Sequence, residues 1–456
     1  MAKQPEKLFS CSKCDAQFPK WAGQCATCGA WGTIKESSIA EEETLRPTNR
    51  VRAKAGGVAS FSSLVGQVNN AHKPTGLPYW DSLLSGGFVD GAVTLLGGEP
   101  GIGKSTVLAQ LGLMMASQGK TVLYVTGEES PAQVALRLKR LTKDIPPSFN
   151  FLDSTNADVI AATIRETTPA LTIVDSVQTI RVPEVVGEPG NPTQIKAGAA
   201  VISEAAKQSR AAVVLVGQVT KDGELAGPRL LEHLVDTVLM MEGDRYQSLR
   251  VIRVLKHRFG STEEVAMLAM TERGLEEVKD PSALLLSNRP AHAPGSVLTC
   301  LMEGSRPVLI EIQALVTPAA YGSPSRRATG VDTNRLSLIL AVLGRRAAIG
   351  FGDQDVFVNV VGGMSATDPS IDFAIALALV SAKLDKPFSS DALAIGELGL
   401  TGELRPAQNT SARIKEAHRL GLTRVYLPHS EKLPKLTQPT LKAYTSIREA
   451  VKEIFA

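Results

Sequence analysis

Residues 98–105, which read Gly-Glu-Pro-Gly-Ile-Gly-Lys-Ser, decide the fold because they match the phosphate-loop pattern GxxxxGK[ST]. The stretch 91–96 before them is apolar and predicts a buried strand, and 103–118 carries apolar residues at helical spacing. A strand, a glycine-rich turn and a helix N-terminus in this order surround phosphate oxygens with backbone amides. The sequence therefore predicts an ATP site formed by Gly98, Glu99, Pro100, Gly101, Ile102, Gly103, Lys104, Ser105 and Thr106.

A carboxylate suited to the metal ion of the nucleotide follows later in the chain. Residues 171–174 are apolar and lead into Asp175, which is the Walker B pattern. The hydroxyl of Ser105 and the carboxylate of Asp175 are oxygen ligands of the kind that Mg²⁺ prefers. We therefore expect Ser105 and Asp175 to hold Mg²⁺, and a strand end with an N-capping aspartate is the alternative interpretation.

Two adjacent glutamates mark a further part of the predicted site. The strand expected at 121–125 leads into Glu128 and Glu129 at the carboxyl edge of the sheet, where ligands bind in such folds. One of the two carboxylates is expected to polarise the attacking water. The other is available to cap the helix that begins at Pro131, and the sequence does not decide between them.

Strands and helices alternate between about residues 76 and 279, which predicts a parallel sheet with helices on both faces. Further strands are expected at 121–125, 171–174 and 212–216, and helices at 131–141, 156–166 and 193–209. The alternation then stops, because the strands expected at 237–241, 249–255 and 265–270 follow one another through short turns. This change predicts an antiparallel extension of the sheet.

The overall composition indicates a globular protein of roughly two to three domains. The chain has 456 residues, of which 43% are hydrophobic and 21% are charged. Its 49 basic and 46 acidic residues give a formal charge of only +3, so net charge gives no indication of nucleic-acid binding. No apolar run has the length of a signal peptide or of a membrane span, which predicts a cytoplasmic protein with no membrane partner.

Four of the five cysteines lie near the N-terminus, as Cys11, Cys14, Cys25 and Cys28. Two Cys-x-x-Cys pairs at this separation match the spacing of a tetrahedral Zn²⁺ site. Two disulfides are the alternative, but a reducing cytosol disfavours them. A segment of roughly 30 residues buries little apolar surface, so zinc would supply its folding free energy.

Changes in composition divide the chain into four segments. Residues 1–34 hold the four cysteines, and 35–75 form a linker that turns from acidic to basic and has little apolar periodicity. The alternating segment covers 76–285, and a proline-rich stretch begins the last segment, 286–456. This α+β segment is expected to contain strands at 296–302 and 308–316 and helices at 334–344 and 371–382.

The arrangement around the loop resembles the RecA-like ATPases, and the whole chain resembles the bacterial RadA (Sms) family of DNA repair and recombination proteins. Four linked features carry the resemblance over essentially all 456 residues: the cysteine motif, residues 98–105, the segment 256–260 and a C-terminal segment similar to Lon protease. The resemblance implies a RecA-like core, a zinc finger and an inactive Lon-like domain. It also implies a DNA-dependent ATPase that forms a hexameric ring on single-stranded DNA and promotes branch migration of recombination intermediates together with RecA.

The resemblance assigns roles to three further side chains. Residues 256–260 read Lys-His-Arg-Phe-Gly where the family has Lys-Asn-Arg-Phe-Gly, so His257 departs from the pattern while Lys256 and Arg258 are retained. These two cations are expected to contact the γ-phosphate bound by a neighbouring subunit, and a solvated basic strand end is the alternative. Gln218 occupies the position that senses the γ-phosphate in RecA-like proteins, although many family members carry histidine there.

DNA contacts are expected in two parts of the chain. In the core, the loop 219–229 supplies Lys221 and Arg229, which suit sequence-independent binding to single strands. A polar surface loop is the alternative, and the RecA-like context favours DNA contact. In the C-terminal segment the candidate phosphate contacts are Arg326, Arg327, Arg345 and Arg346.

The Lon-like segment lacks a complete peptidase pair. Peptidases of this type use a serine and a lysine that deprotonates it. Ser370 matches the serine, but the lysine position falls on Ser411, and the nearby Arg413 stays protonated and cannot replace a base. Asp368 is expected to cap a helix that begins at Pro369, which gives Ser370 a structural explanation. We therefore expect no peptidase activity, and an ATP-dependent protease and a RecA-like regulatory ATPase switch are the alternative functions.

Overall fold

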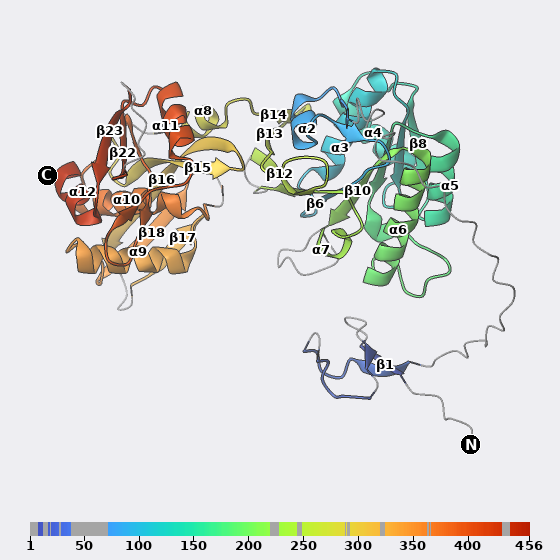
Figure 1. Ribbon diagram of the computed structural model, residues 1–456, viewed down its shortest axis with the longest axis horizontal. Coiled ribbons are helices and arrows are strands. Elements are labelled where there is room, and N and C mark those ends of the chain that lie inside the picture. Colours follow the sequence, from blue (N-terminus) through green and yellow to red (C-terminus); the bar gives the residue numbers. More distant parts are fainter. Residues whose placement is uncertain are drawn as a thin grey trace, which may run out of the picture. The chain divides into compact units, whose positions relative to one another are not determined.

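Figure 1 shows the computed structural model of the chain, with its helices and strands labelled. The structure describes residues 8–11, 17–18, 20–26, 29–37, 72–218, 228–243, 249–287, 289, 292–319, 324–362, 364, 366–430 and 438–456. The chain divides into two compact units, Met1–Asn69 and Asn70–Ala456. Among the described helices, none has both the length and the apolar character that crossing a membrane requires.

The first unit is built on a small antiparallel sheet in the order β2-β1-β3. Its strands are β1 (Leu8–Cys11), β2 (Gln17–Phe18) and β3 (Ile34–Ser37). Cys11, Cys25 and Ile34 form its buried cluster, against which Phe9 and Phe18 pack. Because the described core of this unit is so small, apolar burial stabilises it only weakly.

The phosphate-loop segment belongs to a nine-stranded sheet in the order β14-β13-β12-β11-β6-β10-β9-β7-β8. The parallel strands are β6 (Val93–Gly98), β7 (Val122–Thr126), β8 (Phe149–Asp153), β9 (Leu171–Asp175), β10 (Ala212–Gln218) and β11 (Thr237–Glu242). The antiparallel strands are β12 (Leu249–His257), β13 (Val265–Thr271) and β14 (Gly274–Glu277). The antiparallel extension is therefore present, but it begins one strand later than predicted, because β11 pairs with β6 in parallel.

Helices cover both faces of this sheet, as expected because its central parallel strands are buried along nearly their whole length. α3 (Lys104–Ser117) and α4 (Pro131–Leu141) pack on one face, where Leu108 and Val134 join one core cluster. α5 (Ala157–Thr167) and α6 (Pro192–Ser209) pack on the other face, where Ile160 and Ile195 join a second cluster. The shorter elements are β4 (His72–Lys73), α2 (Pro78–Leu83), β5 (Phe88–Val89), η1 (Val177–Thr179), α7 (Pro228–Leu231) and α8 (Pro281–Leu286).

The C-terminal part contains a seven-stranded sheet in the order β17-β18-β16-β15-β19-β22-β23. Its strands are β15 (Ser296–Glu303), β16 (Arg306–Pro318), β17 (Arg326–Thr329), β18 (Gln354–Val360), β19 (Ala392–Ala394), β22 (Arg424–Pro428) and β23 (Thr440–Tyr444). A separate two-stranded sheet consists of β20 (Glu397–Leu398) and β21 (Leu404–Arg405).

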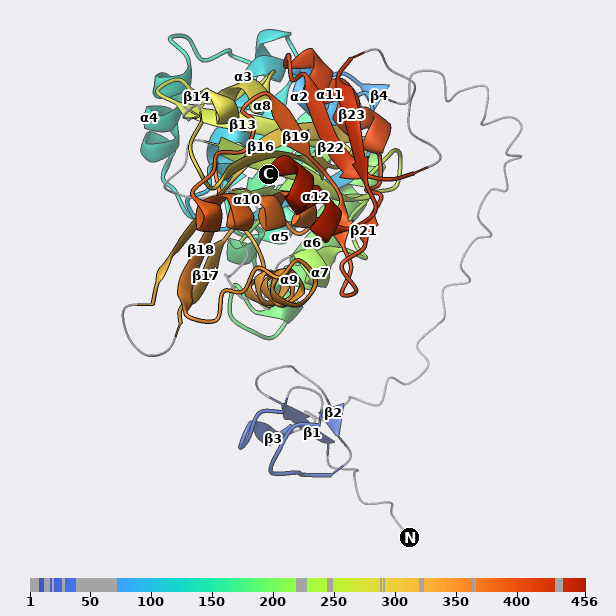
Figure 2. The same cartoon turned by 90° about the vertical axis from the view of Figure 1, so that its left-hand side faces the viewer.

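Two cores lie on the two faces of the seven-stranded sheet. One core contains side chains from α9 (Thr333–Arg346), α10 (Asp372–Leu384) and α12 (Ile447–Ile454). The other contains Leu298 and Val425 of the sheet together with Ile414 of α11 (Thr410–Arg419). Figure 2 shows α10 and α12 side by side, with α11 apart from them. The 3₁₀ turn η2 (Pro369–Ile371) leads directly into α10.

Contacts around β12 link the two large sheets of this unit. Arg253 of β12 lies 3.0 Å from the Glu242 carboxylate of β11 and also forms an ion pair with Glu303, which ends β15. The Glu303 side chain is only 4% exposed, so this pair is largely shielded from solvent. Leu249 and Val251 of the same strand belong to the core cluster that contains the C-terminal helices.

Candidate functional site

Glycine shapes the loop between β6 and α3 at three positions. Gly101 and Gly103 have φ values of 78° and 116°, which residues with a side chain rarely adopt. A Cβ atom on Gly98 would lie 2.6 Å from the carbonyl oxygen of Met241, so the close approach requires glycine. Lys104 then begins the 14-residue helix α3, whose first amides have no helical partner and point toward the loop. This backbone can bind phosphate oxygens.

The Lys104 ammonium turns back onto the loop. Its Nζ donates hydrogen bonds to the carbonyl oxygens of Gly98 (2.8 Å) and Glu99 (2.9 Å), and the residue is 6% exposed. Burial lowers the pKa of Lys104, while the carboxylates of Asp175, Glu128 and Glu99 raise it. Both hydrogen-bond acceptors are neutral, so a charged phosphate oxygen would be a stronger partner for the ammonium.

Strand pairing brings the other predicted residues to the same edge of the sheet. Gln218 ends β10 and is the Cα partner of Gly98, where the loop begins. Asp175 ends β9 and is the Cα partner of Thr126, two residues before Glu128. Because parallel strands present their carboxyl ends at one edge, Gln218, Asp175 and Glu128 gather around the phosphate loop.

The Asp175 carboxylate has a fixed partner inside the sheet. The Tyr124 hydroxyl donates a 2.7 Å hydrogen bond to Asp175 Oδ2, and Tyr124 is fully buried. Burial raises the pKa of Tyr124, so the phenol stays protonated and acts as the donor. The hydroxyl of Ser105, the second residue of α3, and the second oxygen of Asp175 are the kind of donors that fit Mg²⁺. Sequence reasoning missed Tyr124, whose only signal is a polar atom within the apolar stretch 122–125.

The two adjacent glutamates have different partners. Glu128 Oε1 accepts a 2.5 Å hydrogen bond from the hydroxyl of Ser176, the residue after Asp175. Glu129 forms an ion pair with Arg137 of α4. Glu128 therefore lies against the end of β9, whereas the charge of Glu129 is balanced by a cation on the neighbouring helix.

Neither glutamate caps α4, so that part of the prediction is wrong. The cap is Ser130, whose side chain accepts a hydrogen bond from the Gln133 amide while the Gln133 side chain accepts one from the Ser130 amide. This capping box satisfies the amides at the start of the helix. Neither carboxylate is therefore needed as a cap, and the contacts of Glu128 with Ser176 and of Glu129 with Arg137 distinguish the two.

Lys256 and Arg258 lie toward the opposite edge of the sheet from the phosphate loop of their own chain. Lys256 is the Cα partner of Val238, which in turn is the partner of Leu95 in β6. Leu95 precedes Gly98 by about 10 Å of extended strand, and Arg258 lies two residues farther away. These cations are therefore remote from the nucleotide edge that this chain itself forms.

The side chains of Lys256 and Arg258 contact one common segment. Lys256 Nζ donates to the carbonyl oxygens of Glu232 (2.5 Å) and Val235 (2.9 Å). Arg258 lies 3.0 Å from the Asp236 carboxylate and is half exposed. As the alternation along the strand predicts, both cations lie on the same side, over residues 232–236.

The predicted DNA contacts are only partly described. Lys221 and the side chain of Arg229 lie outside the described residues. Arg345 and Arg346 are exposed in the last turn of α9.

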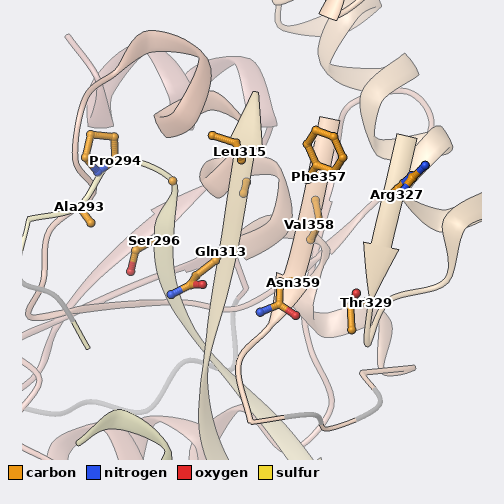
Figure 3. Close-up of a pocket in the computed structure, with 12 residues that line it drawn as sticks. Ala293, Pro294, Ser296, Gln313, Leu315, Arg327, Thr329, Phe357, Val358 and Asn359 are labelled. Carbon is orange, nitrogen blue, oxygen red and sulfur yellow. The ribbon is translucent and has the colours of Figure 1, made fainter. Parts of the chain in front are cut away.

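Arg326 and Arg327 are neighbours on β17, so their side chains point to opposite faces of the sheet. Arg326 Nη2 lies 3.5 Å from the carbonyl oxygen of Phe351. Arg327 lines an open cavity of about 500 Å³ on the other face (Figure 3). One ligand surface can therefore include one of these arginines but not both.

An arginine lies beside Ser370, where a peptidase would need its lysine. Arg413 and Ser370 line the same cavity of about 470 Å³, whereas Ser411 lines a neighbouring cavity. The matched position is therefore Arg413 and not Ser411, and no lysine is among the described residues that line the Ser370 cavity. Arg413 is 1% exposed, and its guanidinium bonds to Asp368 Oδ2 (2.5 Å) and to two backbone carbonyl groups. Asp368 also accepts a hydrogen bond from the Ser370 amide, as the predicted cap requires.

The described cysteines of the first unit fit a metal site. Cys11 and Cys25 come from opposite halves of the motif, yet both are buried in one cluster. The chain turns sharply after Cys25, since the Gly29 amide bonds to its carbonyl oxygen (2.8 Å) and Gly29 has a φ of 70°. Such a turn suits a Cys-x-x-Cys pair that directs both sulfurs to one ion. Cys14 and Cys28 lie outside the described residues.

Three family models match separate parts of the chain. Residues 66–224 match the model of an AAA domain. Residues 9–36 match the rubredoxin metal binding domain, and 335–431 match the subunit ChlI of Mg-chelatase. The matches agree with an α/β ATPase core that is flanked by an N-terminal zinc ribbon and a C-terminal ChlI- or Lon-like region.

Several curated proteins match the chain over nearly its whole length. The DNA repair protein RadA of Pseudomonas aeruginosa is 42% identical over 100% of both chains. The RadA proteins of Escherichia coli and Bacillus subtilis are 43% and 41% identical, and each alignment covers at least 93% of both partners. The phosphate-loop edge, the cysteine motif and these full-length matches together show that the chain belongs to the family of DNA repair protein RadA.

Proposed function

We propose that this chain is a DNA-stimulated ATPase that assembles as a hexameric ring on single-stranded DNA. In this role it promotes branch migration of recombination intermediates together with RecA, in the cytoplasm. The observation that carries the proposal is the separation of the nucleotide edge from Lys256 and Arg258 within one sheet. A chain that keeps these cations away from its own phosphates needs a second copy to complete the site.

Within one subunit, each residue at the nucleotide edge has a separate proposed role in ATP hydrolysis. Lys104 exchanges its loop carbonyl partners for the β- and γ-phosphates. Ser105 and Asp175 would hold Mg²⁺, which neutralises phosphate charge when bound. Glu128 orients the attacking water, because the charge of the neighbouring Glu129 is already paired with Arg137.

Gln218 is proposed to couple nucleotide state to DNA. It lies beside Gly98 at the start of the phosphate loop, and the chain runs from it directly into the loop of Lys221 and Arg229. An amide can donate to a γ-phosphate oxygen and loses that partner after hydrolysis. A conformational change at Gln218 would therefore be passed to the proposed DNA loop, which follows Gln218 directly in the sequence.

Arg258 and Lys256 are proposed to act on the γ-phosphate of the adjacent subunit. Arg258 is half exposed, and its ion-pair partner among the described residues is Asp236, so this pairing has to be exchanged when a neighbour docks. A cation supplied in this way raises the hydrolysis rate by roughly 10³- to 10⁵-fold in related phosphoryl-transfer enzymes.

One face of the seven-stranded sheet is covered by α11 around β15, β19 and β22, but the described residues leave it uncovered over the part of β16 around Leu315 and over β17 and β18. This open sheet face supports a DNA contact in the C-terminal part. Figure 3 shows side chains of β16, β17 and β18 around the cavity. The strand registers arrange these side chains in two rows. The polar row consists of Gln313, Asn359 and Thr329, and the second row consists of the apolar Leu315 and Phe357 followed by Arg327. A flat aromatic surface beside hydrogen-bonding groups and an arginine suits an unstacked base and its phosphate. We propose Arg327 as a phosphate contact here, and Arg345 and Arg346 as further contacts.

The C-terminal part is proposed to be a scaffold without peptidase activity. A serine hydroxyl needs a nearby base to become a nucleophile, and the cation beside Ser370 is an arginine that cannot lose its proton.

The zinc ribbon is proposed to serve contact with RecA. A DNA motor and a regulatory switch would both hydrolyse ATP, but only the motor requires DNA to change the hydrolysis rate. The experiment therefore compares hydrolysis with and without DNA.

The test measures ATP hydrolysis with and without single-stranded DNA, for the wild-type protein and for mixtures of variants. We expect DNA to stimulate hydrolysis. Lys104→Ala and Arg258→Ala should each be inactive alone, and their mixture should recover activity, because some interfaces then combine an intact phosphate loop with an intact arginine. Absence of stimulation would favour the regulatory switch. Absence of recovery in mixtures that still form rings would refute the action of Arg258 on a neighbour.

A further inference from the structure

Four side chains form a continuous hydrogen-bonded chain from α4 to the end of β9. Glu129 pairs with Arg137, and Arg137 Nη1 donates to the Tyr124 hydroxyl at 3.4 Å. The Tyr124 hydroxyl in turn donates to Asp175 Oδ2 at 2.7 Å. Tyr124 lies in β7, Asp175 ends β9 and Arg137 belongs to α4, while Glu129 lies in the loop between β7 and α4.

The first link fixes the orientation of the Asp175 carboxylate. Tyr124 is fully buried, so no water can replace Asp175 as the acceptor for its hydroxyl. A rotation of the Asp175 carboxylate away from the phenol would leave a buried donor without an acceptor, which is unfavourable. With Oδ2 committed to Tyr124, Oδ1 is left for a ligand at the nucleotide edge.

The second link fixes the phenol. The Arg137 guanidinium lies between Glu129 and Tyr124, and its side chain is only 20% exposed. Arg137 supplies the Tyr124 oxygen with a donor, while that oxygen gives its own hydrogen to Asp175. The same guanidinium holds Glu129 at the start of α4, away from Ser176 and Glu128. The Arg137 guanidinium therefore orients the Asp175 carboxylate through Tyr124. It also determines which of the two glutamates is ion-paired and which remains beside Ser176.

We propose that Tyr124 and Arg137 are positioning residues for the metal–nucleotide complex, in which Tyr124 sets the orientation of Asp175 and Arg137 holds Tyr124 and Glu129 in place. The proposal rests on the ATP site proposed above. It makes the affinity for the divalent ion depend on the packing of α4, whose Leu136 is exposed beside Arg137 and whose buried side chains are Val134 and Leu138.

The test uses Tyr124→Phe, which keeps the ring and removes the hydroxyl. Binding of Mn²⁺ in the presence of ADP is followed by electron paramagnetic resonance, and ADP affinity without metal is measured separately. Loss of an outer hydrogen-bond partner typically lowers metal affinity by about 10- to 100-fold, so we expect at least a 10-fold weaker Mn²⁺ affinity for Tyr124→Phe. Affinity for metal-free ADP should change by less than about twofold, since the phosphate loop is untouched. Unchanged Mn²⁺ affinity would overturn the role of Tyr124.

Tyr79→Phe is the matched control, because Tyr79 is another buried tyrosine of the same core cluster and lies in α2. It should leave Mn²⁺ affinity unchanged. An equal loss in both variants would show a general effect of removing a core hydroxyl and would also overturn the proposal.

Arg137 is tested by its conservative replacement. Arg137→Ala should weaken Mn²⁺ binding, and Arg137→Lys should restore it only in part, because an ammonium lacks the fork that reaches both partners. The loss in Tyr124→Phe/Arg137→Ala should be smaller than the product of the two single losses, since the residues act in one chain. Independent losses would refute the link through Arg137. These binding measurements do not require hydrolysis, so failure of the ATPase assignment and failure of this inference give different results.

Discussion

The phosphate-loop edge and the Ser370 cavity both place a buried cation beside polar groups, but the two cations have different partners. Lys104 bonds to two neutral loop carbonyl groups, which an incoming phosphate can replace. Arg413 is bound by the Asp368 carboxylate and by two carbonyl groups, so its hydrogen-bonding capacity serves the fold. The difference indicates that a buried cation can act on a ligand when its partners are exchangeable, and stabilises structure when they are not.

The largest effect is expected at the exchangeable cation. Lys104→Ala should lower ATP hydrolysis by about 10³-fold and weaken ATP binding, because no other charge in the loop contacts the β- and γ-phosphates. Unfolding by urea should show little change, since the Lys104 ammonium donates its hydrogen bonds to two neutral carbonyl oxygens of the loop. Hydrolysis at the wild-type rate in Lys104→Ala would contradict the assignment of Lys104 as a cation that acts on the nucleotide.

The second effect is expected at the structural cation. Arg413→Ala should destabilise the C-terminal part by about 3 kcal/mol, because Asp368 loses its partner in a largely buried pair. Equilibrium unfolding in urea measures this change, and nucleotide affinity should stay unaffected. Arg405→Ala is the control: Arg405 pairs with Glu403 at an exposed site, so its loss should cost less than about 1 kcal/mol. Equal effects of the two substitutions would contradict a special role for burial.

The smallest effect tests a third kind of cation, an arginine with no ion-pair partner among the described residues. Arg327→Ala should weaken binding to single-stranded DNA several-fold and reduce the slope of log affinity against log salt by about one. Arg326→Ala removes an equal charge from the opposite face of β17 and serves as the control. Fluorescence anisotropy at several salt concentrations measures both variants. If Arg326→Ala changes the slope as much as Arg327→Ala does, the open sheet face is not the DNA contact.

Local sequence signals predicted the core of the ATPase fold well. The phosphate loop, the alternating strands and the helix that begins at Pro131 follow from periodicity and glycine spacing, and the structure places them within a few residues of the predictions. β8 and the strands β17, β18, β19, β22 and β23 were not predicted. β18 carries an alternating pattern that the prediction overlooked, with Val356, Val358 and Val360 buried, whereas β17 and β19 have only four and three residues and are too short to show one.

The partners of the site residues could not be predicted, because they depend on strand register. The contact between Tyr124 and Asp175 exists since β7 and β9 are adjacent and in register, and no spacing of 51 residues indicates this. Glu128 and Glu129 are chemically identical neighbours, and only their contacts distinguish them. The prediction that Ser411 takes the lysine position was wrong for a similar reason: the sequence comparison could not show which residue of α11 faces Ser370.

The contacts of β12 have a mechanical consequence. The strand carries Lys256 near one end and Arg253 three residues earlier, about 10 Å along an extended backbone that resists stretching. Under the contact that we propose between Lys256 and a neighbouring subunit, a displacement of Lys256 would be transmitted along β12 to Arg253 and to its ion-pair partner Glu303 in the C-terminal sheet. A displacement at the proposed subunit boundary would in this way reach the C-terminal sheet through one continuous strand.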